Sequence, residues 1–189
     1  IKAYEIPEGS RTAKGMNIVN ILPLMPEEKI TIILPACELD EERFITMVTK
    51  RGIIKRTKLS EFRHTRKSGI IAISIDEDDE LTFVKLTNGD DNLLIATKKG
   101  MAIQFNESGV RAVGRSARGV KAITMRSDDE VVAMEVTDED TRLLTITETG
   151  YGRVSPISDY RLQSRGGKGL MNYRVDKYGD VAAVLEVTD

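Results

Sequence analysis

Thr49-Lys50-Arg51-Gly52 is the stretch that decides the fold, because it returns at a nearly constant distance along the chain. The same four positions read Thr97-Lys98-Lys99-Gly100 and then Thr147-Glu148-Thr149-Gly150. A second glycine also recurs in register, at Gly15, Gly69, Gly119 and Gly169. The spacings run from 48 residues (Gly52 to Gly100) to 54 residues (Gly15 to Gly69), so the chain is a repeat of about fifty residues.

Each unit reads as four short β-strands. In the first complete unit the predicted strands are Phe44 to Thr49, Ile53 to Thr57, Gly69 to Ile75 and Leu81 to Thr87. The first two form a hairpin, because glycine supplies the positive φ that a tight turn needs. A long basic loop, 58–68, follows the hairpin, and one helical turn at its start places Leu59 and Phe62 on the same side. An acidic turn, Asp76 to Glu80, precedes the fourth strand.

Repeated four-stranded units predict an all-β, propeller-like radial array of blades, since one blade cannot cover its own apolar faces. A linear β-solenoid is the weaker alternative, because solenoid coils are usually shorter than fifty residues. We expect a single repeat domain, 1–189, with about four blades. The array is incomplete, because the first unit lacks its first strand. The predicted blades are roughly 1–43 (partial), 44–91, 92–141 and 142–189.

Charge is distributed unevenly, although the formal net charge is only −2. Acidic residues gather in short turns and basic residues in longer loops, so the folded molecule presents a positive face to a polyanion. The single cysteine, Cys37, cannot form an internal disulfide, which fits a reducing cytoplasm. Together with the single histidine, His64, it gives no support for a Cys/His metal site or nucleophile. No apolar run is long enough to span a bilayer, and no secretory leader is seen.

The long loop between the second and third strands carries the predicted binding chemistry. Three of its four versions have the spacing Arg-x-x-(Lys or Arg)-Gly, and the second version keeps two cations displaced by one position. The candidate DNA-binding residues are Arg11, Lys14, Arg66, Lys67, Arg115, Arg118, Arg165 and Lys168. Cations beside small residues allow side chains and backbone amides to reach phosphate oxygens together. No Asn or Gln recurs in register to read bases, so we predict salt-dependent binding to the backbone of a duplex that bends along a rim.

The chain resembles, along essentially its whole length, the C-terminal domain of the bacterial DNA gyrase A family. The residues that carry the resemblance are Tyr4 to Asn20, Ser108 to Gly114 and Gly150 to Arg153. The resemblance implies a β-pinwheel with double-stranded DNA on its outer edge, in a bacterial type II topoisomerase that introduces negative supercoils. It implies that catalytic residues, ATP and Mg²⁺ belong to other parts of that holoenzyme, so no cofactor and no metal site are expected in this chain. The implied partners are the remainder of the gyrase A polypeptide and the gyrase B polypeptide in a heterotetramer, in the cytoplasm and nucleoid, with no membrane.

One departure from the family concerns its hallmark box, Gln-Arg-Arg-Gly-Gly-(Lys or Arg)-Gly, which belongs to the first blade. The nearest match lies in the last unit and has Ser164 in place of an arginine; its other residues are Gln163, Arg165, Gly166, Gly167, Lys168 and Gly169. We therefore expect a box-like loop of a later blade, with the box itself preceding Ile1 in a longer protein. Two alternatives stay open: the corresponding C-terminal domain of topoisomerase IV, and a propeller-like scaffold whose basic loops bind acidic protein partners.

Overall fold

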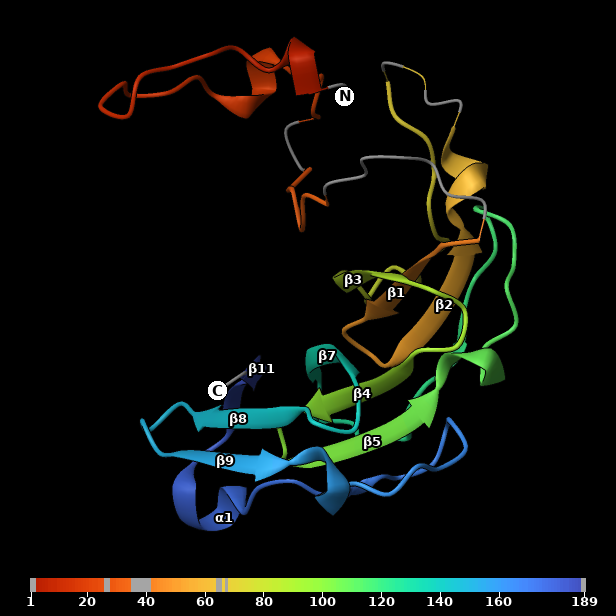
Figure 1. The fold of residues 1–189 in the computed structure, drawn as a ribbon, viewed down its shortest axis with the longest axis vertical. Helices are drawn as coiled ribbons and strands as arrows, with labels where there is room; N and C mark the ends of the chain where they lie inside the picture. Colours follow the sequence, from red (N-terminus) through yellow and green to blue (C-terminus); the bar gives the residue numbers. More distant parts are fainter. Residues whose placement is uncertain (1–2, 26–27, 35–41, 64–65, 67, 188–189) are drawn as a thin grey trace.

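A tight β-hairpin opens each of the three complete units (Figure 1). The computed structural model describes residues 3–25, 28–34, 42–63, 66 and 68–187. The hairpins are β1 (Phe44–Thr49) with β2 (Ile53–Lys58), β4 (Asn92–Thr97) with β5 (Met101–Asn106), and β8 (Arg142–Thr147) with β9 (Gly152–Pro156). Gly52, Gly100 and Gly150 close the turns at positive φ, where a β-carbon is strained. The predicted hairpins are confirmed.

A seven-residue strand lies on the inner side of each hairpin. These strands are β3 (Leu81–Thr87), β7 (Val131–Thr137) and β11 (Val181–Val187), and they pair antiparallel with β1, β4 and β8. Because β7 packs against both β3 and β11, the three sheets fan outward from their inner strands (Figure 1). The all-β prediction is confirmed. The helical elements among the described residues are η1 (Ala3–Glu5), η2 (Ile18–Asn20), η3 (Leu59–Phe62), η4 (Glu107–Gly109), η5 (Ile157–Asp159) and α1 (Val175–Tyr178).

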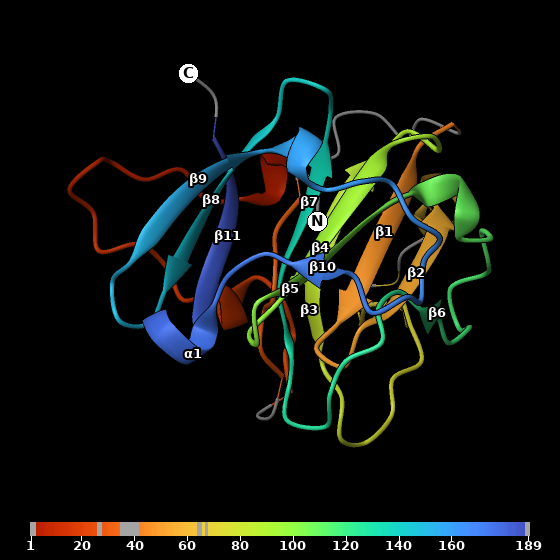
Figure 2. The same ribbon diagram turned by 90° about the horizontal axis from the view of Figure 1, so that it is seen from below.

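The outer strand of a sheet comes from the following unit. β6 (Val120–Lys121) pairs with β2, and β10 (Leu170–Met171) pairs with β5 (Figure 2). The sheet orders are therefore β3-β1-β2-β6 and β10-β5-β4-β7, which corrects the expectation that each unit pairs its own four strands. A β-carbon added at Gly119 would stand 2.2 Å from the Ile54 carbonyl oxygen, and one at Gly169 2.3 Å from that of Ala102. Glycine is needed at both positions, because the chain that leads into β6 or β10 comes so close to the backbone of the neighbouring strand.

Residues 69–75, the predicted third strand of the first complete unit, form no strand. Their counterparts β6 and β10 pair with the hairpin of the preceding unit, whereas the described residues of the first unit contain η1 and η2 and no hairpin. A strand needs a hydrogen-bonded neighbour, and the described residues of the first unit offer no hairpin edge to 69–75. The prediction of a strand there is wrong. The blade boundaries at 43/44, 91/92 and 141/142 stay a prediction, since two of the three sheets draw strands from two units.

Both faces of the middle sheet are buried against its neighbours. One face packs against the first sheet, in a cluster that includes Val48, Ile54, Leu93, Ile95, Ile103 and Phe105. The other face packs against the third sheet, in a cluster that includes Leu94, Ala96, Ala102, Leu143 and Val184. Residues of one strand alternate between the two clusters with the period of two that a β-strand dictates. Stacking of neighbouring units therefore creates the core.

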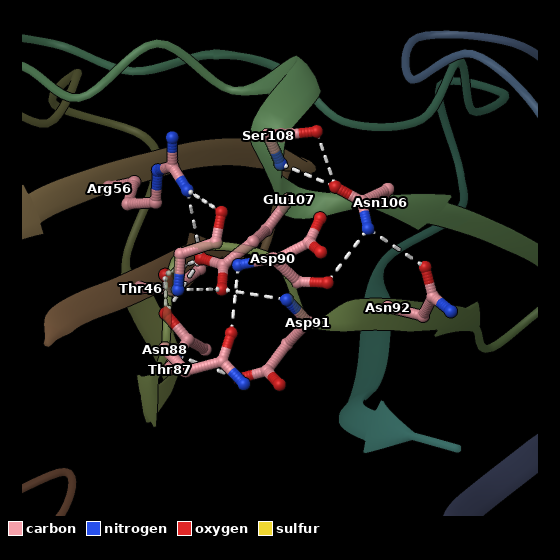
Figure 3. A network of polar contacts seen from close by, with 11 residues as sticks. Thr46, Arg56, Thr87, Asn88, Asp90, Asp91, Asn92, Asn106, Glu107 and Ser108 are labelled. Atoms are coloured by element: carbon pink, nitrogen blue, oxygen red, sulfur yellow. Dashed lines mark hydrogen bonds and ion pairs between the residues drawn. The ribbon is translucent and has the colours of Figure 1, made fainter.

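A fully buried carboxylate, Glu107, joins the first two complete units (Figure 3). One of its oxygens accepts hydrogen bonds from the backbone N–H groups of Gly89 (2.7 Å) and Asp91 (3.1 Å). The other accepts from the Thr87 hydroxyl at 2.7 Å and lies 3.4 Å from Nη1 of Arg56, which is itself buried. With donors on both oxygens, this charge is well satisfied in the core.

Candidate nucleic-acid interface

Each of the last two basic loops lies along the outer edge of the preceding unit's hairpin. After η4 the chain runs parallel to β2, with a bridge between Arg56 and Ala112, and then returns antiparallel as β6. The loop after η5 repeats this path along β5, with a bridge between Gln104 and Leu162, and returns as β10. Successive sheets therefore carry these cationic loops at equivalent positions on their outer edges.

A cleft of about 970 Å³ opens between the first two complete basic loops. Its lining contains three arginines, Arg63, Arg66 and Arg115, and one acidic residue, Glu61. The structure thus brings together Arg66 and Arg115, which the sequence assigns to different loops. The sequence missed Arg63, although it belongs to the same basic run as Arg66. The predicted residue Lys67 lies outside the described residues.

Several predicted cations have side chains without a hydrogen bond or ion pair to the described residues. They are Arg11, Lys14, Arg66, Arg115 and Lys168; Arg115 is half-buried and the others are exposed. Arg11 and Lys14 flank a turn closed by a hydrogen bond from Ala13 N to Ser10 O (3.1 Å), and they do not line the cleft. Arg66 and Arg115 are therefore the two predicted residues that offer charge to one common ligand.

Arg118, by contrast, is already paired. Its Nη2 contacts the Asp76 carboxylate, which belongs to the acidic turn of the preceding unit. The two segments are also joined by a hydrogen bond from Ser74 N to Ala117 O (3.3 Å). An anion bound at Arg118 therefore competes with Asp76.

We expect Asp76→Asn to raise the affinity for duplex DNA about twofold to threefold, the small effect typical of an exposed ion pair. The change releases the Arg118 guanidinium and removes one negative charge from the outer edge. Titration of a fluorescent duplex at low salt measures the effect. Asp78→Asn is the matched control, because Asp78 pairs with Arg51 of the tight turn and not with a basic loop. Equal gains in both variants would mean that only net charge matters.

The main chain of the box-like loop is fixed by the preceding unit. Gln163 N donates to Gln104 O at 2.8 Å, and Gly166 N donates to Ala122 O at 2.5 Å. The Gly166 carbonyl accepts from the Thr124 hydroxyl at 2.7 Å. Of the remaining box residues, the Gly167 carbonyl accepts a hydrogen bond from Thr124 N, Lys168 is exposed, and Gly169 directly precedes β10.

The Arg165 side chain donates hydrogen bonds to two backbone carbonyls of the chain itself. Its Nε donates to Gly109 O at 2.9 Å and its Nη1 to Lys121 O at 3.2 Å. Both carbonyls belong to the preceding unit, so this guanidinium ties two neighbouring basic loops together. Both box cations are exposed, but Lys168 is the one whose side chain makes no hydrogen bond or ion pair with the described residues.

Lysines of the tight turns form ion pairs with glutamates of the acidic turns and of the next tight turn. Lys50 lies 3.2 Å from Glu80 and 3.1 Å from Glu130, and Lys98 lies 3.5 Å from Glu130 and 3.1 Å from Glu148. Hydrogen bonds to Glu130 and Glu80 raise the pKa of Lys50, and the bond from Lys50 lowers the pKa of Glu130. Among the predicted basic-loop cations, Arg66, Arg115 and Lys168 therefore make no ion pair with the described residues, whereas Arg118 does.

Lys55 is a residue of this interface that the sequence prediction passed over. It lies in β2, where a lysine in an alternating strand is usually taken to face solvent, yet it is fully buried. Its Nζ donates to the carbonyl of Arg115 in the basic loop. The available signal was the repeat register, which places Ile103 and Arg153 at the same position. A position shared by isoleucine and cations indicates a partly apolar setting.

Three observations concern membrane spans, metal ligands, and the single cysteine and histidine. No helix among the described residues is long and apolar enough to cross a membrane. The described residues hold no group of three or more His, Cys, Asp and Glu placed to bind a metal. Cys37 and His64 lie outside the described residues.

Relatives of the chain are similar along its full length. It is 57% identical over 190 residues to the DNA gyrase A polypeptide of Clostridium acetobutylicum, which covers 100% of this chain and 23% of that protein. It is 43% identical over 192 residues to the DNA gyrase A polypeptide of Staphylococcus aureus, covering 100% of this chain and 22% of that protein. The chain thus spans about a quarter of the length of these curated relatives.

Solved structures share the fold. A structure of the DNA gyrase A C-terminal domain matches with a TM-score of 0.82 and 28% identity, covering 100% of this chain and 61% of that one. A crystal structure of the C-terminal domain of DNA topoisomerase IV matches with a TM-score of 0.85 and 26% identity, covering 93% of this chain and 55% of that one. The family described as "DNA gyrase C-terminal domain, beta-propeller" matches residues 1–35, 43–88, 91–138 and 141–188. Fold, repeat register and relatives agree, and the chain belongs to the family of DNA gyrase C-terminal domains.

Proposed function

We propose that this chain binds duplex DNA without sequence preference and bends it around the outer edges of its sheets. The observation that carries the proposal is the cleft between successive basic loops, lined by Arg63, Arg66 and Arg115. Arginine forks match phosphate oxygens, and backbone contacts give no base readout. The next outer edge adds Lys168, so a duplex that follows the fan of sheets meets cations at successive units.

Bending is favoured only if these contacts offset its elastic cost. Bending a site of 20–30 base pairs by 40–90° costs on the order of 1–6 kcal/mol. Each phosphate contact releases counterions and contributes a salt-dependent share of the binding free energy. Repetition of the loop in successive units therefore supplies the binding free energy for bending that one loop alone cannot.

In the parent protein this binding would serve a type II topoisomerase that introduces negative supercoils, with the gyrase B polypeptide and the remainder of the gyrase A polypeptide as partners. ATP and Mg²⁺ would act in those other parts. The parent would work in the bacterial cytoplasm, on the DNA of the nucleoid. These proposals rest on the relatives named as DNA gyrase A polypeptides, of which the chain spans about a quarter.

Titration of a random-sequence duplex at 50 to 200 mM salt tests the proposal. With six to ten phosphate contacts, affinity should fall by about 10³ to 10⁵ over this range, with similar slopes for unrelated sequences. A duplex labelled at both ends should show increased energy transfer on binding, which reports bending. Absence of binding at 50 mM salt, or binding to one sequence alone, would overturn it.

The chain also matches a solved C-terminal domain of DNA topoisomerase IV, and the second candidate is that DNA is bent in a plane without being wrapped. Relaxing a circular plasmid with a topoisomerase in the presence of the chain separates the two. A change in linking number proportional to bound protein indicates wrapping, whereas bending in a plane leaves the linking number unchanged.

A further inference from the structure

Lys55 is a buried cation that joins two segments of the candidate interface. Its side chain is fully buried in the middle of β2. Its Nζ donates to the carbonyl of Ala72 at 2.6 Å and to the carbonyl of Arg115. Ala72 lies in the segment 69–75 that follows the first complete basic loop, and Arg115 belongs to the next loop. The ammonium group therefore bridges the two sides of the arginine-lined cleft.

Keeping this charge in the core is costly, because its partners among the described residues are two neutral carbonyls and no carboxylate. Burial, with a smaller contribution from the charge of Arg115, lowers the pKa of Lys55 to about 8. A buried charge without a counter-ion is rarely retained for stability. The strand position does not itself demand lysine either, since Ile103 and Arg153 occupy it in the next two units.

The two outer-edge loops differ in the side chain that anchors each of them to the preceding unit. In the box-like loop, Arg165 uses its own guanidinium to bond carbonyls of the preceding unit. In the loop before it, Lys55 holds the main chain at Arg115, and the Arg115 guanidinium makes no hydrogen bond or ion pair with the described part of the chain. The box-like loop is therefore anchored by its own arginine, whereas the loop before it is anchored by Lys55 of strand β2.

We infer that Lys55 is a positioning residue for DNA binding, which fixes the main chain of the basic loop so that the Arg115 guanidinium faces a phosphate across the cleft. The inference rests on the proposed function. It predicts that Lys55 contributes to affinity through Arg115 and not through the other outer-edge cations.

A double-mutant cycle on the whole chain tests this coupling. Lys55→Met removes both hydrogen bonds and the charge at similar volume, and should weaken binding of a random duplex about tenfold. Adding Arg115→Ala should then change affinity less than twofold, although Arg115→Ala alone also weakens binding about tenfold. Lys168→Ala, in the next loop, should act independently, so that its fold-loss of affinity multiplies with that of Lys55→Met. Lys177→Met is the matched control for the loss of one lysine, because Lys177 is exposed in α1, and it should leave affinity within twofold.

The outcomes separate this inference from the proposed function. If Arg115→Ala weakens binding but Lys55→Met does not, or if Lys55→Met is additive with both Arg115→Ala and Lys168→Ala, the positioning role is wrong and DNA binding stands. If the unmodified chain binds no duplex at 50 mM salt, the proposed function fails first. Circular dichroism checks folding. If Lys55→Met unfolds, the same cycle is run with Lys55→Ile, which also removes the donors and the charge and is the residue type that the next unit carries at this position, Ile103.

Discussion

Glu107→Ala should lower the free energy of unfolding by about 3–5 kcal/mol, the cost typical of breaking a buried ion pair by removing one partner. The change leaves the buried Arg56 guanidinium without its carboxylate and the N–H groups of Gly89 and Asp91 without their acceptor. It also empties space in the core, which adds a cavity cost. Because the network spans two units, the whole chain should unfold at lower denaturant concentration.

Urea denaturation followed by circular dichroism measures this loss. Glu80→Ala is the control, since Glu80 forms an exposed ion pair with Lys50 and its removal should cost less than about 1 kcal/mol. Glu107→Gln should fall between the two, because the amide keeps the shape and one acceptor oxygen. A loss below about 1 kcal/mol for Glu107→Ala would show that the network does not hold the units together.

Among the cations of the basic loops, Arg115→Ala should give the largest single loss of DNA affinity, about tenfold, as expected for a charge-assisted hydrogen bond. The slope of log affinity against log salt should become shallower by about 0.9, the value for one phosphate contact. The loss should be uniform across sequences, since the contact reads no base. Fluorescence anisotropy at several salt concentrations measures both quantities.

Arg118→Ala is the matched comparison within the same loop. Arg118 already pairs with Asp76, so its removal should weaken binding less than removal of Arg115. The sequence alone assigns the two arginines equal roles. Equal losses in the two variants would mean that the ion pair with Asp76 opens at no cost when DNA binds, and a loss confined to particular sequences would mean that the loop reads bases.

Local sequence was sufficient for the elements whose partners are close in the chain. The helical turn that buries Leu59 and the strand Leu81–Thr87 appear as predicted, and the hairpin predicted for 44–57 appears with one more residue, Lys58. Their apolar periodicity, the turn glycine and the short loops determine them without reference to other units.

The rest depends on contacts between units, which a repeat register does not reveal. Gly69–Ile75, Val120–Lys121 and Leu170–Met171 look equivalent in sequence, yet two of them form strands and one does not, because pairing depends on the preceding hairpin. Charge is equally context-dependent. Glu107 occupies the position of Leu59 and Ile157, and its burial follows from donors supplied by other segments.

Because the outer strand of a sheet comes from the following unit, the sheets also complete in a fixed order during synthesis. β2 ends at Lys58, but the strand that covers its outer edge ends at Lys121, about sixty residues later. At roughly 5–20 residues per second, the ribosome leaves that edge open for on the order of several seconds. An open edge invites pairing with other nascent chains, and charged side chains on it discourage such pairing. Lys55, Arg56 and Lys58 all lie on β2, so cations of which two are buried in the folded chain, Lys55 and Arg56, also protect the open edge of the nascent chain.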